Sequence, residues 1–202
     1  VKVYHLNIGQ PDIKSPQCAI DAIRNFDLDN VSYSHSAGIM ELRKGLVEKY
    51  YKKIGIDINV SDLIVTVAGS ESVNLAISIT CDEGDEVIVL EPFYTNYNTF
   101  AYMNGVTLKA ISTDIREGFQ VPAIEEFEKA ITDKTKAILI CNPGNPTGTL
   151  YSKEEMLALG EIARKHDLFL LSDEVYREFC YTDEPHFSAM NIKGIEDKVI
   201  LI

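Results

Sequence analysis

Two stretches decide the fold of this chain: Asn142-Pro143-Gly144-Asn145-Pro146-Thr147-Gly148 and Ser172-Asp173-Glu174-Val175-Tyr176. Each follows a short apolar segment, residues 137–141 in the first case and residues 168–172 in the second. Short, continuous apolar segments are typical of strands buried in a parallel sheet. Because ligands of such sheets lie beyond the carboxyl ends of the strands, the two stretches predict a binding site at one edge of a sheet.

An amide, a carboxylate and a phenol meet at this predicted edge. Two prolines and two glycines hold Asn145 in a rigid turn, where its amide can donate a hydrogen bond. Asp173 ends an apolar strand and needs a partner such as a protonated ring nitrogen, because burying an unpaired carboxylate is costly. Tyr176 can donate to a phenolic oxygen alongside Asn145. The set suits pyridoxal phosphate (PLP), although Asp173 could instead cap the segment that follows.

Composition limits the class of protein. The chain has 202 residues, of which 46% are apolar and 25% charged, which is the profile of a soluble globular protein. The net charge of −12 disfavours nucleic acid or an anionic membrane as a partner, and the apolar runs are far too short to span a membrane. Cys18, Cys81, Cys141 and Cys180 are widely spaced, which favours reduced core thiols in a cytoplasmic protein over a metal site or disulfides.

Helical and strand-like patterns alternate along most of the chain. We expect helices at residues 16–26, 40–54, 71–81, 95–104, 122–132 and 152–166, and strands at residues 63–67, 86–91, 106–111, 136–141, 168–172 and 198–202. Ser15 is the expected N-cap of the first helix, and Ser152 with Glu155 forms a capping box at the last. Leu42 and Tyr51 are expected on the apolar face of the second helix.

This alternation predicts an α/β fold with three layers, in which helices cover both faces of a mostly parallel sheet. We expect residues 61–202 to form this cofactor-binding domain, incomplete at its C-terminus. Residues 1–60 are helical and rich in loops. They are expected to form a segment that contacts the active site and a second, small domain.

Further residues at or near the same edge have a chemical and a structural interpretation. Gly69, Ser70 and Glu71 lie between an expected strand and a helix, where backbone N–H groups can hold a phosphate. The structural alternative is an ordinary turn, with Gly69 for its tightness and Ser70 as N-cap. Tyr94 follows a strand and can stack on a flat cofactor, or it can be a core or surface aromatic residue. Gly9 would allow a close backbone approach to a ligand, and Tyr33 could reach a phosphate.

Taken together, these segments resemble the large domain of a fold-type-I PLP-dependent aminotransferase, of the class I/II group that includes aspartate aminotransferases. The resemblance covers essentially all 202 residues in the family's order. The Asn-Pro-Thr-Gly string and the Asp-x-x-Tyr string, at this separation, are its specific motifs. The glycine and tyrosine positions are less specific.

The resemblance implies roles for individual residues. Asp173 would pair with the pyridine nitrogen, Asn145 and Tyr176 would hold the phenolic oxygen, and Tyr94 would stack on the ring. Gly69, Ser70 and Glu71 would contact the phosphate. Tyr33 matches a tyrosine that reaches the phosphate of the neighbouring subunit, which implies a homodimer with shared sites, and Gly9 matches a backbone contact to the substrate carboxylate. The implied substrates are an amino acid and a 2-keto acid.

The chain departs from the family in one respect that bears on activity. The lysine that carries the cofactor lies beyond the strand that ends at Ile202, and Lys193 and Lys198 are expected to be surface residues. We therefore expect an active parent enzyme and an inactive segment, with an incomplete N-terminus as well. A C–S lyase or another fold-type-I enzyme, a sensor domain that binds PLP without turnover, and a nicotinamide dehydrogenase are the alternatives; the absence of G-x-G-x-x-G argues against the last.

Overall fold

The structure is a computed structural model that describes residues 2–4, 9–11, 13–27 and 29–202. Its internal contacts divide the chain into two compact units, residues 1–35 and residues 36–202. The first unit contains helix α1 (Gln17–Arg24). The expected cap at Ser15 is wrong, because Pro16 occupies the N-cap position with a ψ of 130°, so the chain enters the helix only after the proline.

A five-stranded parallel sheet forms the centre of the second unit. Its order is β2-β1-β3-β4-β5, and each neighbouring pair is parallel. The strands are β1 (Glu86–Glu91), β2 (Thr107–Ser112), β3 (Thr135–Cys141), β4 (Phe169–Asp173) and β5 (Val199–Leu201). Five of the six predicted strands are therefore confirmed, each to within one residue at both ends.

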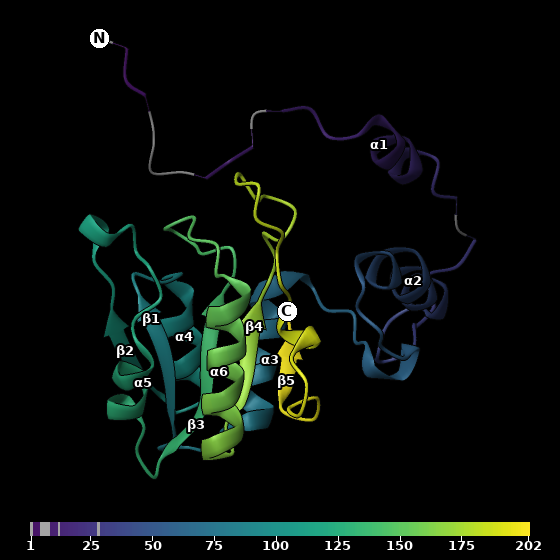
Figure 1. The fold of residues 1–202 in the computed structure, drawn as a ribbon. Coiled ribbons are helices and arrows are strands. Elements are labelled where there is room, and N and C mark those ends of the chain that lie inside the picture. Colours follow the sequence, from purple (N-terminus) through teal and green to yellow (C-terminus); the bar gives the residue numbers. More distant parts are fainter. Residues whose placement is uncertain (1, 5–8, 12, 28) are drawn as a thin grey trace. The chain divides into compact units, whose positions relative to one another are not determined.

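Helices cover both faces of the sheet, which confirms the three-layer fold. Figure 1 shows α6 (Lys153–His166) in front of the sheet and α3 (Ala68–Thr80) behind it. Helix α5 (Ile124–Ala130) packs with α6, and α4 (Asn96–Met103) packs with α3. Along the strands, alternate side chains enter the two cores: Val87 and Val89 join the core under α3 and α4, and Ile88 joins the other.

Helix α6 shows why these residues form these elements. The Ser152 hydroxyl accepts a hydrogen bond from the Glu155 N–H at 3.2 Å, and Glu155 Oε2 accepts one from the Ser152 N–H at 2.7 Å. This is the predicted capping box. Met156, Leu159 and Ala163 then recur at helical spacing on one face, and all three are fully buried. Burial of each large apolar side chain contributes roughly 1.5–3 kcal/mol.

The strand predicted at residues 63–67 is wrong. The segment contains no strand, and the Val65 N–H donates to Ala37 O at 3.0 Å, away from the sheet. Ile64 and Val67 are exposed. A groove of about 530 Å³ is lined on one side by Leu63 and Ile64 and on the other by residues of β5. A strand needs a neighbouring strand that forms hydrogen bonds with its backbone groups. The groove lies between residues 63–64 and β5, so the segment does not pair with β5.

The helix predicted at residues 40–54 is present but irregular. It starts as α2 (Met40–Gly45), continues as a π-helical segment (Leu46–Tyr51) and ends in a 3₁₀ turn (Lys52–Ile54). Leu42, predicted on the apolar face of this helix, is 48% exposed. The buried residue is Arg43, whose guanidinium donates to Leu63 O at 2.9 Å and to Val60 O.

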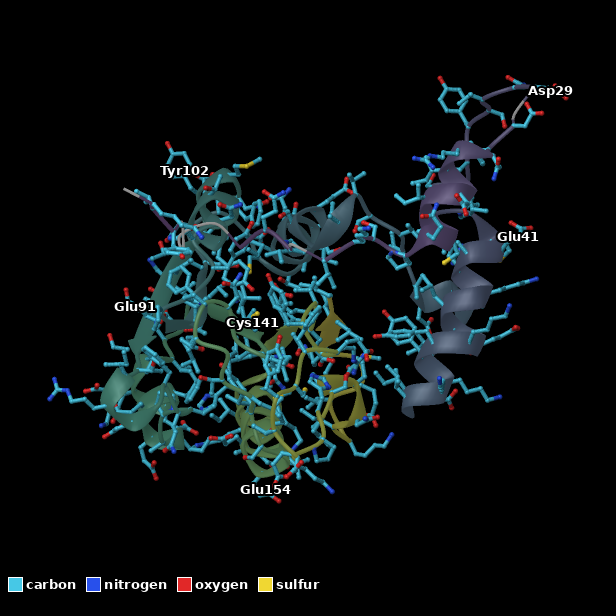
Figure 2. The ribbon with its side chains drawn as sticks, turned by 90° about the horizontal axis from the view of Figure 1, so that it is seen from above. Asp29, Glu41, Glu91, Tyr102, Cys141 and Glu154 are labelled. Carbon is cyan, nitrogen blue, oxygen red and sulfur yellow. The ribbon has the colours of Figure 1, made fainter. Side chains whose placement is uncertain are left out.

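The four cysteines differ in how deeply they are buried. All four cysteines are free; Cys141 is buried and Cys18 is exposed, so the core assignment holds for the former and is wrong for the latter. Figure 2 shows Cys141 in the middle of the second unit, with Glu91, Tyr102 and Glu154 towards its periphery.

Within the described residues, no helix has the length and apolar character needed to cross a bilayer.

Candidate functional site

The carboxyl ends of β1, β3 and β4 form the edge at which the predicted residues gather. Cys141 and Asp173 end β3 and β4, and they face each other in the strand register. The segment after β1 continues into α4 through Phe93 and Tyr94. The parallel sheet therefore presents three loops at one edge, as expected for a ligand site in this class of fold.

Asp173 is a buried carboxylate, with 6% of its surface exposed. Its Oδ2 accepts a hydrogen bond from the Tyr97 hydroxyl at 2.6 Å, and its Oδ1 accepts a longer one from the Val175 N–H at 3.3 Å. Burial raises the pKa of Asp173, and these two hydrogen bonds oppose the rise. Within the described part of the chain, Asp173 forms no ion pair with a lysine, arginine or histidine. The Asp173 carboxylate is thus placed to pair with a cation that the described residues do not supply.

Tyr97 is the partner that the sequence interpretation missed. Its side chain is 1% exposed, and burial raises the pKa of its phenol well above the usual range. Phe93 stacks on its ring at 6.2 Å between centroids, and Tyr94 meets it edge-on at 5.6 Å. Burial also raises the pKa of the neighbouring Cys141 thiol to about 12, so this thiol stays protonated at neutral pH.

The loop after β3 is fixed at both ends, and it carries Asn145. Asn142 is fully buried; its N–H donates to Asp173 O at 2.9 Å, and its Oδ1 accepts from the Tyr151 N–H at 3.0 Å. Further along the loop, the Gly148 N–H donates to Gly144 O at 2.8 Å. This confirms a hydrogen-bonded turn within the predicted stretch.

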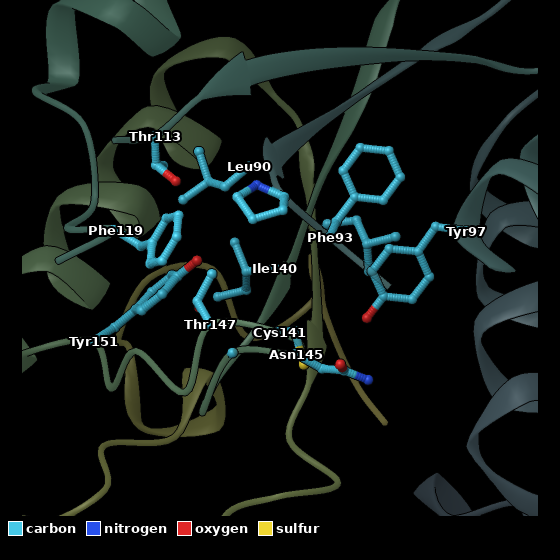
Figure 3. A pocket seen from close by; sticks show the side chains of 13 residues that line it. Leu90, Phe93, Tyr97, Thr113, Phe119, Ile140, Cys141, Asn145, Thr147 and Tyr151 are labelled. Carbon is cyan, nitrogen blue, oxygen red and sulfur yellow. The ribbon is translucent and has the colours of Figure 1, made fainter. Parts of the chain in front are cut away.

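A small cavity of about 30 Å³, room for about one water, brings Asn145 together with Tyr97 and Cys141. Figure 3 shows the Tyr97 hydroxyl and the Asn145 amide on the same side of this cavity. The amide predicted from the first stretch and the tyrosine that binds Asp173 therefore belong to one site.

Tyr176 completes the group of polar side chains at this edge. Its ring is 39% exposed and meets Phe179 edge-on at 6.3 Å. Partial burial raises the pKa of the Tyr176 phenol, and the nearby Cys141, Asp173 and Tyr94 add to the rise. The structure thus brings together Tyr94, Asn145, Asp173 and Tyr176, which the sequence places far apart.

The first turn of α3 differs from its prediction. The helix starts at Ala68, so Ser70 lies inside it and is not the N-cap. The residue with positive φ is Ala68, at 71°, so Gly69 is not what allows the turn. A Cβ on Gly69 would instead make a tight contact, 3.1 Å from Val175 Cγ1, which that side chain would have to move to relieve. This contact places the first turn of α3 beside the loop that follows Asp173.

Glu71 closes the same turn, since its Oε2 accepts a hydrogen bond from the Val67 N–H. An acidic side chain in the first turn suits the positive end of a helix. Its carboxylate is therefore engaged with the protein backbone. A contact of Glu71 to a ligand would come from its backbone N–H.

Four other residues from the sequence interpretation belong to other segments of the chain. Gly9 and Tyr33 belong to the first unit, where Tyr33 is fully exposed, and their roles stay predictions. Lys193 is exposed, and Lys198 pairs with Asp167 at 2.8 Å near the amino end of β5. The expected surface position is confirmed for Lys193, whereas Lys198 is half-buried, with 25% of its side chain exposed.

Comparisons with known proteins place this site in context. A sequence model of the family described as "Aminotransferase class I and II" matches residues 1–202. The aspartate/prephenate aminotransferase of Thermus thermophilus is 38% identical over 93% of this chain and 49% of its own length. The aspartate aminotransferase of Thermotoga maritima is 33% identical over 99% of this chain and 53% of its own.

Solved structures agree with these sequence matches. The crystal structure of the Thermotoga maritima aspartate aminotransferase superimposes with a TM-score of 0.91, covering 99% of this chain and 53% of that one. An aromatic aminotransferase from Pyrococcus horikoshii gives a TM-score of 0.88 at 29% identity, over 97% of this chain and 52% of that one. The chain spans about half the length of the relatives it matches.

Proposed function

Because the chain belongs to the class I and II aminotransferase family, whose members depend on PLP, we propose that it forms the cofactor-holding part of an aminotransferase. The reaction is transfer of an amino group between an amino acid and a 2-keto acid. The observation that carries the proposal is Asp173, a buried carboxylate at a strand end that has a phenol donor but no cation among the described residues.

The residues at the carboxyl edge fit PLP by their chemistry. Asp173 offers an acceptor to a protonated ring nitrogen, and pairing with a cation removes much of the cost of burying its charge. Asn145 and Tyr176 are donors that suit a phenolic oxygen. Tyr94, at the entrance of α4, offers an aromatic ring to the face of the cofactor.

The phosphate fits the first turn of α3. Backbone N–H groups at a helix N-terminus attract anions, and Gly69 presents no side chain that would cover them. We assign the phosphate contacts to the backbone of Gly69, Ser70 and Glu71 and to the Ser70 hydroxyl. Gly9 would contact the substrate carboxylate through its backbone.

Bound PLP supplies a protonated ring that draws electrons from the bonds at the substrate's α-carbon. The residues of this chain hold and tune that ring. Asp173 would hold the proton on the ring nitrogen, and the Tyr97 hydroxyl orients Asp173 and favours its ionised form through their hydrogen bond. Asn145 and Tyr176 would hold the ring through its phenolic oxygen, which together with the Asp173 contact would prevent the ring from rotating within the site.

The proposal is tested with Asp173→Ala in the full-length protein. We expect loss of most turnover with a folded protein, because the ring-nitrogen proton loses its partner. Asp167→Ala is the matched control, since it removes an exposed aspartate that pairs with Lys198 next to the amino end of β4. Near-normal turnover in the Asp173 variant would sink the assignment.

The products distinguish the possible reactions. Stoichiometric keto acid formation in a half-reaction, with the amino group retained by the protein-bound cofactor, identifies an aminotransferase. Release of pyruvate and ammonia identifies a β-eliminating lyase, and PLP binding without either product identifies a sensor. Pyridoxal, which lacks the phosphate, should bind much more weakly than PLP if the first turn of α3 holds the phosphate.

We also assign the parent protein to the cytoplasm, as a homodimer in which Tyr33 reaches the phosphate of the neighbouring subunit. Sedimentation of the full-length protein measures the oligomeric state. Tyr33→Phe should weaken PLP binding in the dimer without changing that state. Equal affinity in both proteins would count against the role of Tyr33.

A further inference from the structure

The buried carboxylate of Glu174, next to Asp173, connects the carboxyl edge of the sheet to residues 188–189. The side chain of Glu174 is 1% exposed. Its Oε1 accepts three hydrogen bonds, from the Ser172 hydroxyl at 3.0 Å, the Ser188 hydroxyl at 3.1 Å and the Ala189 N–H at 2.9 Å. Residues 172–174 are thus tied to residues 188–189.

The second oxygen of Glu174 faces two nitrogens. Oε2 lies 3.1 Å from Arg177 Nη2 and 3.6 Å from His186 Nε2. Neither contact has hydrogen-bond geometry, and Oε2 has no other hydrogen-bond partner among the described residues. Both partners are nearly buried, with side chains 11% and 8% exposed. One oxygen of Glu174 therefore binds Ser172 and residues 188–189, and the other faces Arg177 and His186.

His186 bridges two of the segments that end at the site. Its Nδ1 lies 3.3 Å from Arg177 Nη2, and its Nε2 lies 3.1 Å from Asn142 O. Guanidinium nitrogens only donate and carbonyl oxygens only accept. The contacts therefore require a neutral imidazole, with the proton on Nε2 and a lone pair on Nδ1. Burial lowers the pKa of His186, which favours this neutral form.

Each residue that His186 contacts is close in sequence to a proposed cofactor contact. Asn142 starts the loop that carries Asn145, and its N–H is bonded to Asp173 O. Arg177 follows Tyr176 directly, and its N–H donates to Glu174 O at 3.0 Å. Asn145 and Tyr176 reach the site from different strands, so their spacing depends on what connects the two loops.

We propose that His186 is a positioning residue that sets the spacing between Asn145 and Tyr176, through its bridge from Asn142 O to Arg177. This inference rests on the proposed function, because those two residues are assigned to the phenolic oxygen of PLP. His186 itself does not touch the cofactor. Its contribution should therefore appear in how well the site recognises that oxygen, and little elsewhere.

Equilibrium binding to the full-length protein, freed of cofactor, provides the test. The two probes are PLP and its 3-O-methyl ether, in which the phenolic oxygen is blocked. The measured quantity is the dissociation constant of the ether divided by that of PLP. In His186→Ala we expect PLP binding to weaken about five- to tenfold, the effect of losing roughly one hydrogen bond, while binding of the ether is nearly unchanged, so the ratio falls.

Two conservative variants separate the contacts of the bridge. The Gln amide can place an N–H near the position of Nε2, so His186→Gln should keep the bond to Asn142 O and a ratio near that of the wild type. The Asn carbonyl can accept from Arg177 at the position of Nδ1 but leaves Asn142 O without a donor, so His186→Asn should resemble His186→Ala. These variants also keep the test available if His186→Ala does not fold.

The matched control is His166→Ala. Like His186, His166 lies near a glutamate, here Glu128 at 2.7 Å, but it ends α6 on the side where β4 begins. It should leave the ratio unchanged. If the wild type separates the two probes and all three His186 variants separate them equally well, the positioning role is overturned while the proposed function stands. If the wild type binds neither probe, the proposed function fails, and this inference fails with it.

Discussion

The Tyr97 hydroxyl donates a 2.6 Å hydrogen bond to Oδ2 of Asp173, and both side chains are almost completely buried. The bond favours the ionised form of Asp173 in a place where burial favours the protonated form. Tyr97 is therefore the residue that adjusts how firmly Asp173 can hold a proton on a cofactor ring.

Tyr97→Phe in the full-length protein should lower turnover about tenfold, since a hydrogen bond to a charged group contributes about 1.5–3 kcal/mol. The pKa of Asp173 should rise further without the phenol. The pH dependence of the bound cofactor's absorbance measures this. Phe93→Leu is the control, because it disturbs the ring that stacks on Tyr97 without removing the polar contact. Identical pH profiles for wild type and Tyr97→Phe would contradict the role.

Asp173→Asn should separate stability from function. Burial raises the folded-state pKa of Asp173, so between its unfolded and folded pKa values the folded protein binds more protons than the unfolded chain. Stability from this group therefore falls as the pH rises through that window. Asparagine does not titrate and still accepts from Tyr97.

The cofactor-free Asn variant should thus gain stability relative to the wild type as the pH rises from about 4 to 7. Urea denaturation at several pH values measures the difference in the free energy of unfolding. Turnover should nevertheless be lost. A difference in stability that does not change with pH would mean that Asp173 is not buried as a destabilised carboxylate.

Glu174→Gln should destabilise the protein more than the same change on the surface. An amide nitrogen in place of Oε2 would face Arg177 and remove the carboxylate charge that the nearly buried guanidinium pairs with. Breaking one partner of a buried ion pair costs about 3–5 kcal/mol. Glu161→Gln is the control, because Glu161 pairs with Arg164 at 2.6 Å with both side chains exposed, and such pairs contribute about 1 kcal/mol or less. Chemical denaturation compares the two, and equal losses would show that the Glu174 network contributes little.

Two helical glycines should respond in opposite directions to alanine. A Cβ on Gly160 in α6 would lie 2.6 Å from Ile192 Cγ2, so Gly160→Ala should cost about 1–3 kcal/mol through overpacking. Gly45 in α2 has open space at this position and helical backbone angles. Gly45→Ala should therefore stabilise by about 0.5–1 kcal/mol. Thermal denaturation checks both, and the cost of Gly160→Ala should be smaller in an Ile192→Ala background, where the Cγ2 methyl is absent.

The sequence predicts the sheet and its helices well because their signals are local. The apolar run before Asn142 and the capping box at Ser152 specify a strand and a helix without knowledge of distant residues. The segment at residues 63–67 has the same apolar signal, but whether it joins a sheet depends on a neighbour beside β5. That neighbour is not encoded in the segment itself.

The site is predictable where chemistry and position in the chain coincide. Asn145 and Asp173 follow strands directly, so the fold brings them to the edge. Tyr97 and His186 act through contacts 76 and 44 residues away, with Asp173 and Asn142. An aromatic cluster from Phe93 to Tyr97 was the only signal for the first. Nothing local distinguishes His186 from a surface histidine.

The parallel arrangement of β1, β3 and β4 has a practical consequence for working with this protein. The turns on the opposite side, such as the one around Asp133 between α5 and β3, are exposed and lead into the strands at their amino ends. A fluorophore or an affinity handle attached there would be separated from Asp173 by the length of the strands. Such a probe could report on the folding of the sheet without itself altering ligand binding.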